Sequence, residues 1–173
     1  MDLASAIFSK LDKYALMAIP MFILAGNLLS TSSSARRIVD FAKTFAGHLP
    51  GGLPIAAIFA SIIFAAVSGS SPATVATIGF LMFGAITAAG YPKTYAVGTI
   101  TASGSLSILI PPSIVMIIYG VTAEISIGKL FIAGIIPGLL IGGMLMMVAY
   151  IGARRLGFKK NKTSKLKRKV AKI

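Results

Sequence analysis

A short uncharged turn in the middle of an apolar region decides the fold: Ser68-Gly69-Ser70-Ser71-Pro72-Ala73-Thr74. Apolar runs at 53–67 and 75–89 flank this turn, and each is marginal for a membrane-spanning helix, which needs about 20 apolar residues. The two runs could form two full crossings, or two half-length helices of a re-entrant hairpin. Because the turn is rich in hydroxyls and carries no charge to mark a water interface, it favours the hairpin. Its non-helical backbone must then lie against protein or a water-filled cavity.

A second break lies at the centre of the next uncharged window, 94–123, where the sequence reads GSLSILIPPS over 104–113. Proline removes a backbone donor and clashes with the preceding turn of a helix. It also pushes the residue before it out of the helical conformation. The double proline therefore predicts a helix that unwinds near 110–112 and resumes through 114–119.

The composition excludes an ordinary soluble domain. Hydrophobic residues make up 56% of the chain and charged residues only 12%, too few to cover the surface of a soluble protein of 173 residues. Lys and Arg number 17 against four Asp and Glu, and the basic residues gather in the tail 154–173. Because this basicity is a tail and not a face, we expect no nucleic-acid partner. The absence of cysteine excludes disulfides and thiolate metal sites.

The uncharged windows 14–35 and 130–153 each fit one spanning helix. Together with the hairpin and the broken helix they predict an all-α integral membrane protein. The positive-inside rule places the basic tail in the cytoplasm, so the last span runs from outside to inside. Between the first span and the hairpin, apolar residues recur at helical spacing over 36–48, which predicts an interfacial amphipathic helix with Ser34 as its cap, or else a simple connecting loop.

The spans offer neutral oxygens and no ionisable groups. The one histidine, His48, is expected at an interface, so serine catalysis has no base, and proton relays and His–carboxylate metal sites are likewise not expected. We therefore predict no catalytic residues. Both breaks carry hydroxyls and free carbonyls, which suit a weakly bound Na⁺, and half-helix N-termini after Pro72 and Pro112 suit an anion. This combination is typical of secondary transporters. The hydroxyls of the two breaks are Ser68, Ser70, Ser71, Thr74, Ser105, Ser107 and Ser113.

Small residues could instead serve packing alone. Gly134, Gly138 and Gly142 form a smooth face on the last span, which predicts close packing with a neighbouring helix or a homodimer seam. The alternative function is therefore a membrane structural or assembly subunit that packs through its glycine-rich faces and transports nothing. A small channel is a weaker interpretation, because no ring of charges is available to line a pore.

Ordered motifs along most of the chain resemble one family. They are AIPMFILAGN (18–27), GGL (51–53), FAAVSGSSPAT (64–74), GYP (90–92), LIPPS (109–113), EISIG (124–128) and FIAGIIPG (131–138). As a set, they resemble the large membrane (DctM-like) subunit of tripartite ATP-independent periplasmic (TRAP) transporters. The resemblance implies an inner-membrane symporter, half of an inverted-repeat elevator-type fold, that takes up small organic acids such as C4-dicarboxylates using the Na⁺ gradient.

The resemblance also implies partners and site residues. A periplasmic substrate-binding protein would deliver the substrate, and a small membrane subunit would complete the complex; no cofactor is expected besides Na⁺ as coupling ion. The resemblance implies a Na⁺ site at Ser68, Gly69, Ser70, Ser71, Gly104, Ser105 and Pro111. It implies a substrate site at Ser71, Pro72, Ala73, Thr74, Pro112 and Ser113.

The expected segments follow from the windows and the resemblance together. They are a periplasmic N-terminal segment (1–13), a scaffold helix (14–35), an interfacial arm helix (36–50), a re-entrant hairpin (51–90), a broken helix (91–120), a periplasmic loop with the last spanning helix (121–153) and a basic cytoplasmic tail (154–173). Because the family is longer and has two inverted repeats, the chain is expected to be a fragment that needs a partner chain supplying the second repeat. The tail is expected to lie on anionic lipid or to be a solvated remnant.

Overall fold

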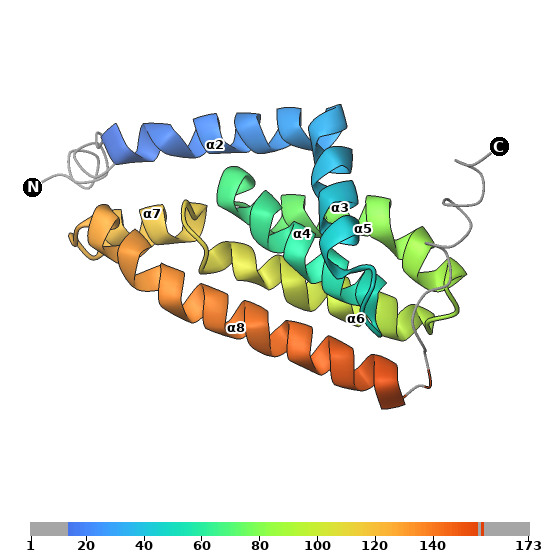
Figure 1. Cartoon of the computed structure of the whole chain (residues 1–173). Helices are drawn as coiled ribbons and strands as arrows, with labels where there is room; N and C mark the ends of the chain where they lie inside the picture. Colours follow the sequence, from blue (N-terminus) through green and yellow to red (C-terminus); the bar gives the residue numbers. More distant parts are fainter. Residues whose placement is uncertain (1–13, 156, 158–173) are drawn as a thin grey trace, which may run out of the picture.

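The computed structural model describes residues 14–155 and 157, and every regular element in this part of the chain is helical (Figure 1). This confirms the predicted all-α class. The expected segment 1–13 and most of the expected tail lie outside the described residues. The elements are α2 (Tyr14–Thr31), α3 (Ser33–Ala46), α4 (Gly52–Ser68), α5 (Ser71–Ala88), α6 (Lys93–Gly104), the 3₁₀ turn η1 (Ser105–Ile108), α7 (Ile114–Thr122) and α8 (Ile127–Arg155).

The first break is a tight helix–turn–helix. Gly69 ends α4 in the left-handed conformation, with φ of 60°, which glycine adopts without steric cost. Ser70 then caps α5, because its hydroxyl accepts a hydrogen bond from the backbone N–H of Ala73 at 3.5 Å. Pro72 occupies the first turn of α5, where a missing N–H costs nothing. The turn chemistry of 68–74 thus produces the predicted interruption.

The second break follows the predicted course. The α-helix α6 ends at Gly104, tightens into η1 and unwinds before a cis peptide bond between Pro111 and Pro112. Ser113 caps the next helix, α7, by accepting a hydrogen bond from the backbone N–H of Met116 at 3.5 Å. Helix therefore resumes at residue 114, as the double proline predicts.

The position of the hairpin tip (68–71) can be given as a level along helix α8. Helix α4 runs antiparallel to it: Gly51 packs on Ala153, and Ile62 packs on Gly142. Since Ser68 lies six residues beyond Ile62, the tip reaches the level of about residue 136 of α8. The tip therefore lies about nine residues, or about 14 Å, from Ile127, the first residue of α8. Figure 1 shows α4 ending beneath α2, before it reaches α7.

The second break lies at the same level as the tip. A side chain on Gly134 would meet the carbonyl oxygen of Leu109, and one on Gly138 would meet Ile110. Beyond the tip, α7 continues until Gly120 packs on Ile127, at the start of α8. Both interruptions therefore lie within the length of α8. The glycine face of α8 packs within the same chain: Gly134 and Gly138 meet the second break, and Gly142 meets Ile62 of the neighbouring helix α4.

Two helices, α5 and α8, are long and apolar enough to cross a membrane, and the pair α2–α3 would add a third span if it is counted as one bent element. The expected scaffold helix 14–35 ends earlier, at Thr31, and the chain bends by 70° into α3. The cap of α3 is Ser32, whose hydroxyl accepts from the N–H of Ser34 at 3.2 Å. The prediction that Ser34 caps this helix was wrong, because the bend comes two residues earlier.

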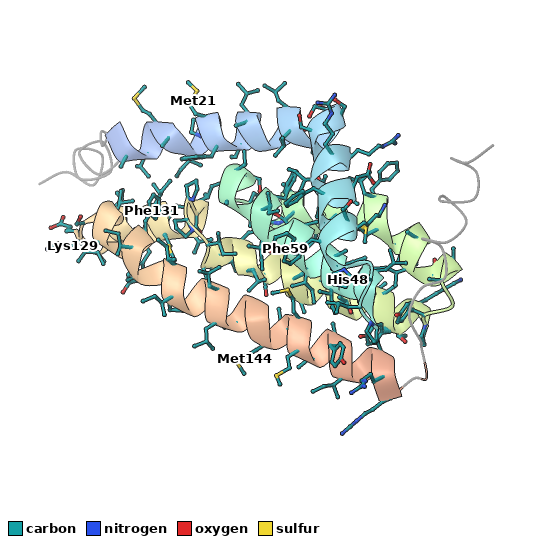
Figure 2. The ribbon with its side chains drawn as sticks, in the orientation of Figure 1. Met21, His48, Phe59, Lys129, Phe131 and Met144 are labelled. Carbon is teal, nitrogen blue, oxygen red and sulfur yellow. The ribbon has the colours of Figure 1, made fainter. Side chains whose placement is uncertain are left out.

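Basic residues gather at one end of the bundle. The hydroxyl of Tyr95 donates to the carbonyl oxygen of Ala149 at 2.8 Å, which fixes the start of α6, with Lys93, beside the last turn of α8 with Arg154. Lys129 lies at the opposite end (Figure 2). Lys93 and Arg154 therefore share one end of the bundle, and Lys129 lies at the other.

Candidate functional site

The two helix breaks are in direct backbone contact. The N–H of Ile114, at the start of α7, donates to the carbonyl oxygen of Gly69 at 3.1 Å. A Cβ atom built on Gly69 would lie 2.8 Å from the carbonyl oxygen of Pro112, closer than real Cβ atoms come. Glycine is therefore needed at position 69 for two reasons, its positive φ and the close approach of the Pro112 carbonyl.

Thr74 is the centre of a buried hydroxyl cluster at this contact. Its Oγ1 donates to the carbonyl oxygen of Ser70 at 2.8 Å and lies 2.8 Å from the Oγ of Ser107 and 3.2 Å from the Oγ of Ser68. A hydroxyl has one hydrogen and two lone pairs. Thr74 therefore donates to Ser70 and accepts from Ser107 and Ser68, which saturates it. Ser68, Thr74 and Ser107 are fully buried and join α4, α5 and η1.

A second buried hydroxyl pair lies further along the hairpin from its tip. The Oγ atoms of Ser61 on α4 and Ser103 on α6 are 2.9 Å apart, and both residues are fully buried. Each hydroxyl also lies within hydrogen-bond distance of a carbonyl of its own helix. Sequence reasoning missed both residues, because they lie within apolar helical runs. The available signal was the spacing of Ser103 and Ser107, which are four residues apart and share a face.

The structure brings together part of the predicted Na⁺ site. Ser68, Gly69 and Ser70 meet the second break through the contacts described above, and Ser71 begins α5 beside them. Ser105 lies outside the cluster: it is exposed, and its hydroxyl donates to the carbonyl oxygen of Ala102 at 2.7 Å. Ser107 contributes the hydroxyl instead.

The remaining ion-site residues are backbone positions. Gly104 is buried so tightly against Val75 of α5 that a Cβ there would collide with that side chain. Pro111 is half-buried in the unwound segment. The close approach of α5 to Gly104 holds the start of the second break against the hairpin.

The predicted substrate residues divide into an inner and an outer group. Thr74 and Ser113 are fully buried, with their hydroxyls engaged in the cluster and in the cap of α7. Pro72 is exposed, while Ala73 and Pro112 are half-buried. The outer group therefore lies at the surface of the described part of the chain, together with the half-buried Ser71.

The side-chain and backbone oxygens at the two breaks are neutral. Among residues 14–155 and 157, no cluster of His, Asp and Glu that could hold a metal ion is present. The N-termini of α5 and α7 both lie next to Gly69, so two positive helix-dipole ends are directed at one region. The arrangement combines carbonyl and hydroxyl oxygens, which suit a monovalent cation, with helix N-termini, which suit an anion.

Comparison with known proteins decides the family. Residues 2–172 match the family described as tripartite ATP-independent periplasmic transporter, DctM component. The chain belongs to the DctM family. It is 51% identical, over 153 residues, to the C4-dicarboxylate TRAP transporter large permease protein DctM of Pseudomonas aeruginosa, a match that covers 88% of this chain and 36% of the relative. The chain thus spans about a third of that relative's length.

Other DctM-family relatives have different substrates in their names. The sialic acid TRAP transporter permease protein SiaT of Haemophilus influenzae is 45% identical over 148 residues, covering 86% of this chain and 24% of the relative. The isethionate TRAP transporter permease protein DctMQ of Oleidesulfovibrio alaskensis is 43% identical over 156 residues, covering 90% of this chain and 25% of the relative. Both relatives are named as transporter permeases, the class of protein that the resemblance predicts.

Proposed function

We propose that this chain forms the ion-binding and part of the substrate-binding region of a TRAP large permease that takes up small organic acids together with Na⁺. One observation carries the proposal: the two helix breaks meet at a single level within the length of α8, through the Gly69–Ile114 hydrogen bond and the Thr74–Ser107 hydroxyl contact. Interrupted helices that meet inside a membrane protein are a feature of Na⁺-coupled secondary transporters.

The proposed Na⁺ ligands are the oxygens of the hairpin tip and of η1. Ser68, Ser70, Thr74 and Ser107 offer hydroxyls or carbonyls within one buried cluster. Without Na⁺ these hydroxyls form hydrogen bonds with one another. A bound Na⁺ would replace those hydrogen bonds, so the site needs no preformed cavity. Neutral ligands favour weak binding and rapid exchange, which suit an ion that is released in every transport cycle.

The proposed substrate is a small organic anion. The N-termini of α5 and α7 offer backbone N–H groups and positive dipole ends, and the exposed Pro72 leaves this surface accessible. The names of the relatives point the same way, since C4-dicarboxylate, sialic acid and isethionate are all organic anions. Selectivity among such anions would depend on the protein segments that close the open side of the site.

The proposed setting is a multi-pass protein of the bacterial inner membrane whose C-terminal tail is cytoplasmic and lies on anionic lipid. The proposed partners are a small membrane subunit, a periplasmic substrate-binding protein and a polypeptide that supplies the second repeat. The open side of the substrate surface at Pro72 supports this need for further helices. The glycine face of α8 is used within the chain and therefore does not supply a face for the alternative assembly role.

A chimera tests this function. The matching part of the Pseudomonas aeruginosa relative would be replaced by residues of this chain, in cells that retain the other components of that transport system. We expect uptake of a C4-dicarboxylate that requires Na⁺ and is not supported by K⁺, and we expect Thr74→Val to abolish the Na⁺ dependence. Thr87→Val, on the same helix but far from the cluster, is the matched control. Normal assembly with Na⁺-independent uptake in the unmutated chimera would contradict the proposal.

A further inference from the structure

Helix α3 has three different faces. Its small buried face packs against α4. Its end leads to Gly51, which packs on Ala153 in the last turn of α8, and α3 crosses α4 on the way to this turn (Figure 1). The bend of 70° from α2 turns it away from the direction of the spans. Its apolar and basic faces are those of an amphipathic helix that binds at a membrane surface. The buried face consists of Ala35, Val39, Ala42 and Ala46.

The second face of α3 is aromatic and open. Phe41 is 59% exposed and Phe45 63% exposed, although both rings contact that of Phe59 on α4. The ring centroids of Phe45 and Phe59 are 5.2 Å apart and stacked, and those of Phe41 and Phe59 are 6.2 Å apart. Phe41 and Phe45 also form part of the lining of an open surface hollow of about 510 Å³. The hollow is lined by Phe41, Thr44, Phe45, His48 and Leu49.

The third face is basic and borders the aromatic one. Arg37 lies one helical turn before Phe41, so its guanidinium can reach the rim of the hollow. Among the described residues, Asp40 is the one acid at this end of the bundle, and it pairs with Lys43 at 3.5 Å. Arg37 is exposed and has no acidic partner in the described part of the chain. The hollow therefore combines an apolar wall with an uncompensated positive charge on its rim.

We propose that this hollow seats one anionic phospholipid, with its phosphate at Arg37 and an acyl chain against Phe41 and Phe45. Charge complementarity argues for this occupant, because the rim is basic and the wall is apolar, and a phospholipid presents both chemistries at the membrane surface. A basic residue near an anionic surface contributes about a fivefold gain in affinity. The lipid would fix α3 at the surface, where it links α2 to the hairpin. This site is separate from the hydroxyl cluster and does not depend on Na⁺ transport.

Tryptophan fluorescence in vesicles tests the proposal, because the natural sequence contains no tryptophan. The full chain with Phe45→Trp would be reconstituted in phosphatidylcholine vesicles containing either brominated phosphatidylglycerol or brominated phosphatidylcholine, whose bromines quench nearby indoles. We expect severalfold stronger quenching by the anionic lipid at equal mole fraction. Met144→Trp, on the face of α8 that points away from the bundle, should show no preference (Figure 2).

Charge variants complete the test. Adding Arg37→Gln to Phe45→Trp should lower the preference for phosphatidylglycerol about fivefold, whereas Lys129→Gln, which removes the same charge from the opposite end, should leave it unchanged. Phe41→Trp serves as a second reporter if Phe45→Trp does not fold. Equal preference at positions 45 and 144, or a preference insensitive to Arg37→Gln, would overturn the proposal. Quenching at 144 with none at 41 or 45 would mean that protein covers the hollow, which would also overturn it.

Discussion

Replacing Thr74 by valine removes the centre of the hydroxyl cluster while keeping the shape of the side chain. Three hydrogen bonds are lost, to the carbonyl of Ser70 and from the hydroxyls of Ser107 and Ser68. Hydrogen bonds between membrane helices contribute about 0.6 kcal/mol each on average, so the free energy of unfolding should fall by about 2 kcal/mol. For a protein of this size that corresponds to a loss of about 6 °C in Tm.

Thermal unfolding in a mild detergent, followed by far-ultraviolet circular dichroism, would measure this loss. Thr87→Val provides the matched control, because Thr87 lies on the same helix and its hydroxyl bonds only carbonyls of that helix, those of Phe83 and Gly84. We expect the control to shift Tm by no more than about 1 °C, since its freed carbonyls remain bonded within the helix. If the two variants lose the same stability, the cluster does not join the two breaks in the way described.

Three further predictions concern packing and orientation. Gly134→Ala should lower stability by about 2 kcal/mol, because its Cβ would lie 2.5 Å from a backbone oxygen of the second break; Gly143→Ala, which meets nothing within 4 Å, should raise stability slightly in the same thermal assay. Tyr95→Phe should cost about 1 kcal/mol through the lost hydrogen bond to α8, measured by its shift in Tm. Because the chain has no cysteine, Lys93→Cys and Lys129→Cys can be labelled singly; an impermeant maleimide should reach only the second in intact cells, and the reverse pattern would invert the proposed orientation.

The positions of the breaks could be predicted from local chemistry. Gly69 and Pro72 end one helix and begin another, and the double proline at 111–112 interrupts the next, because these residues act on their own backbone. Ser70 and Ser113 cap the new helices for the same reason. Such features depend on residues close in sequence, so the sequence alone was sufficient to place them.

The contacts between the breaks could not be predicted in this way. The hydrogen bond between Thr74 and Ser107 depends on how closely α5 approaches η1. Gly104 permits this approach because it has no side chain to collide with Val75 of α5. Within η1, Ser107 is buried and Ser105 is exposed, and which of the two faces the hairpin depends on how the turn packs against α5. Sequence periodicity does not reveal where an α-helix tightens. Packing in three dimensions therefore determines which of the hydroxyls at the two breaks come together in the buried cluster.

The central claim is that the hydroxyl cluster joining the two breaks binds Na⁺, and equilibrium binding of radioactive sodium to the purified chain in lipid nanodiscs tests it most directly. We predict saturable binding that K⁺ does not displace, present in the natural sequence and in Thr87→Val and lost in Thr74→Val. No saturable Na⁺ binding in the natural sequence, or equal binding in both variants, would contradict the account.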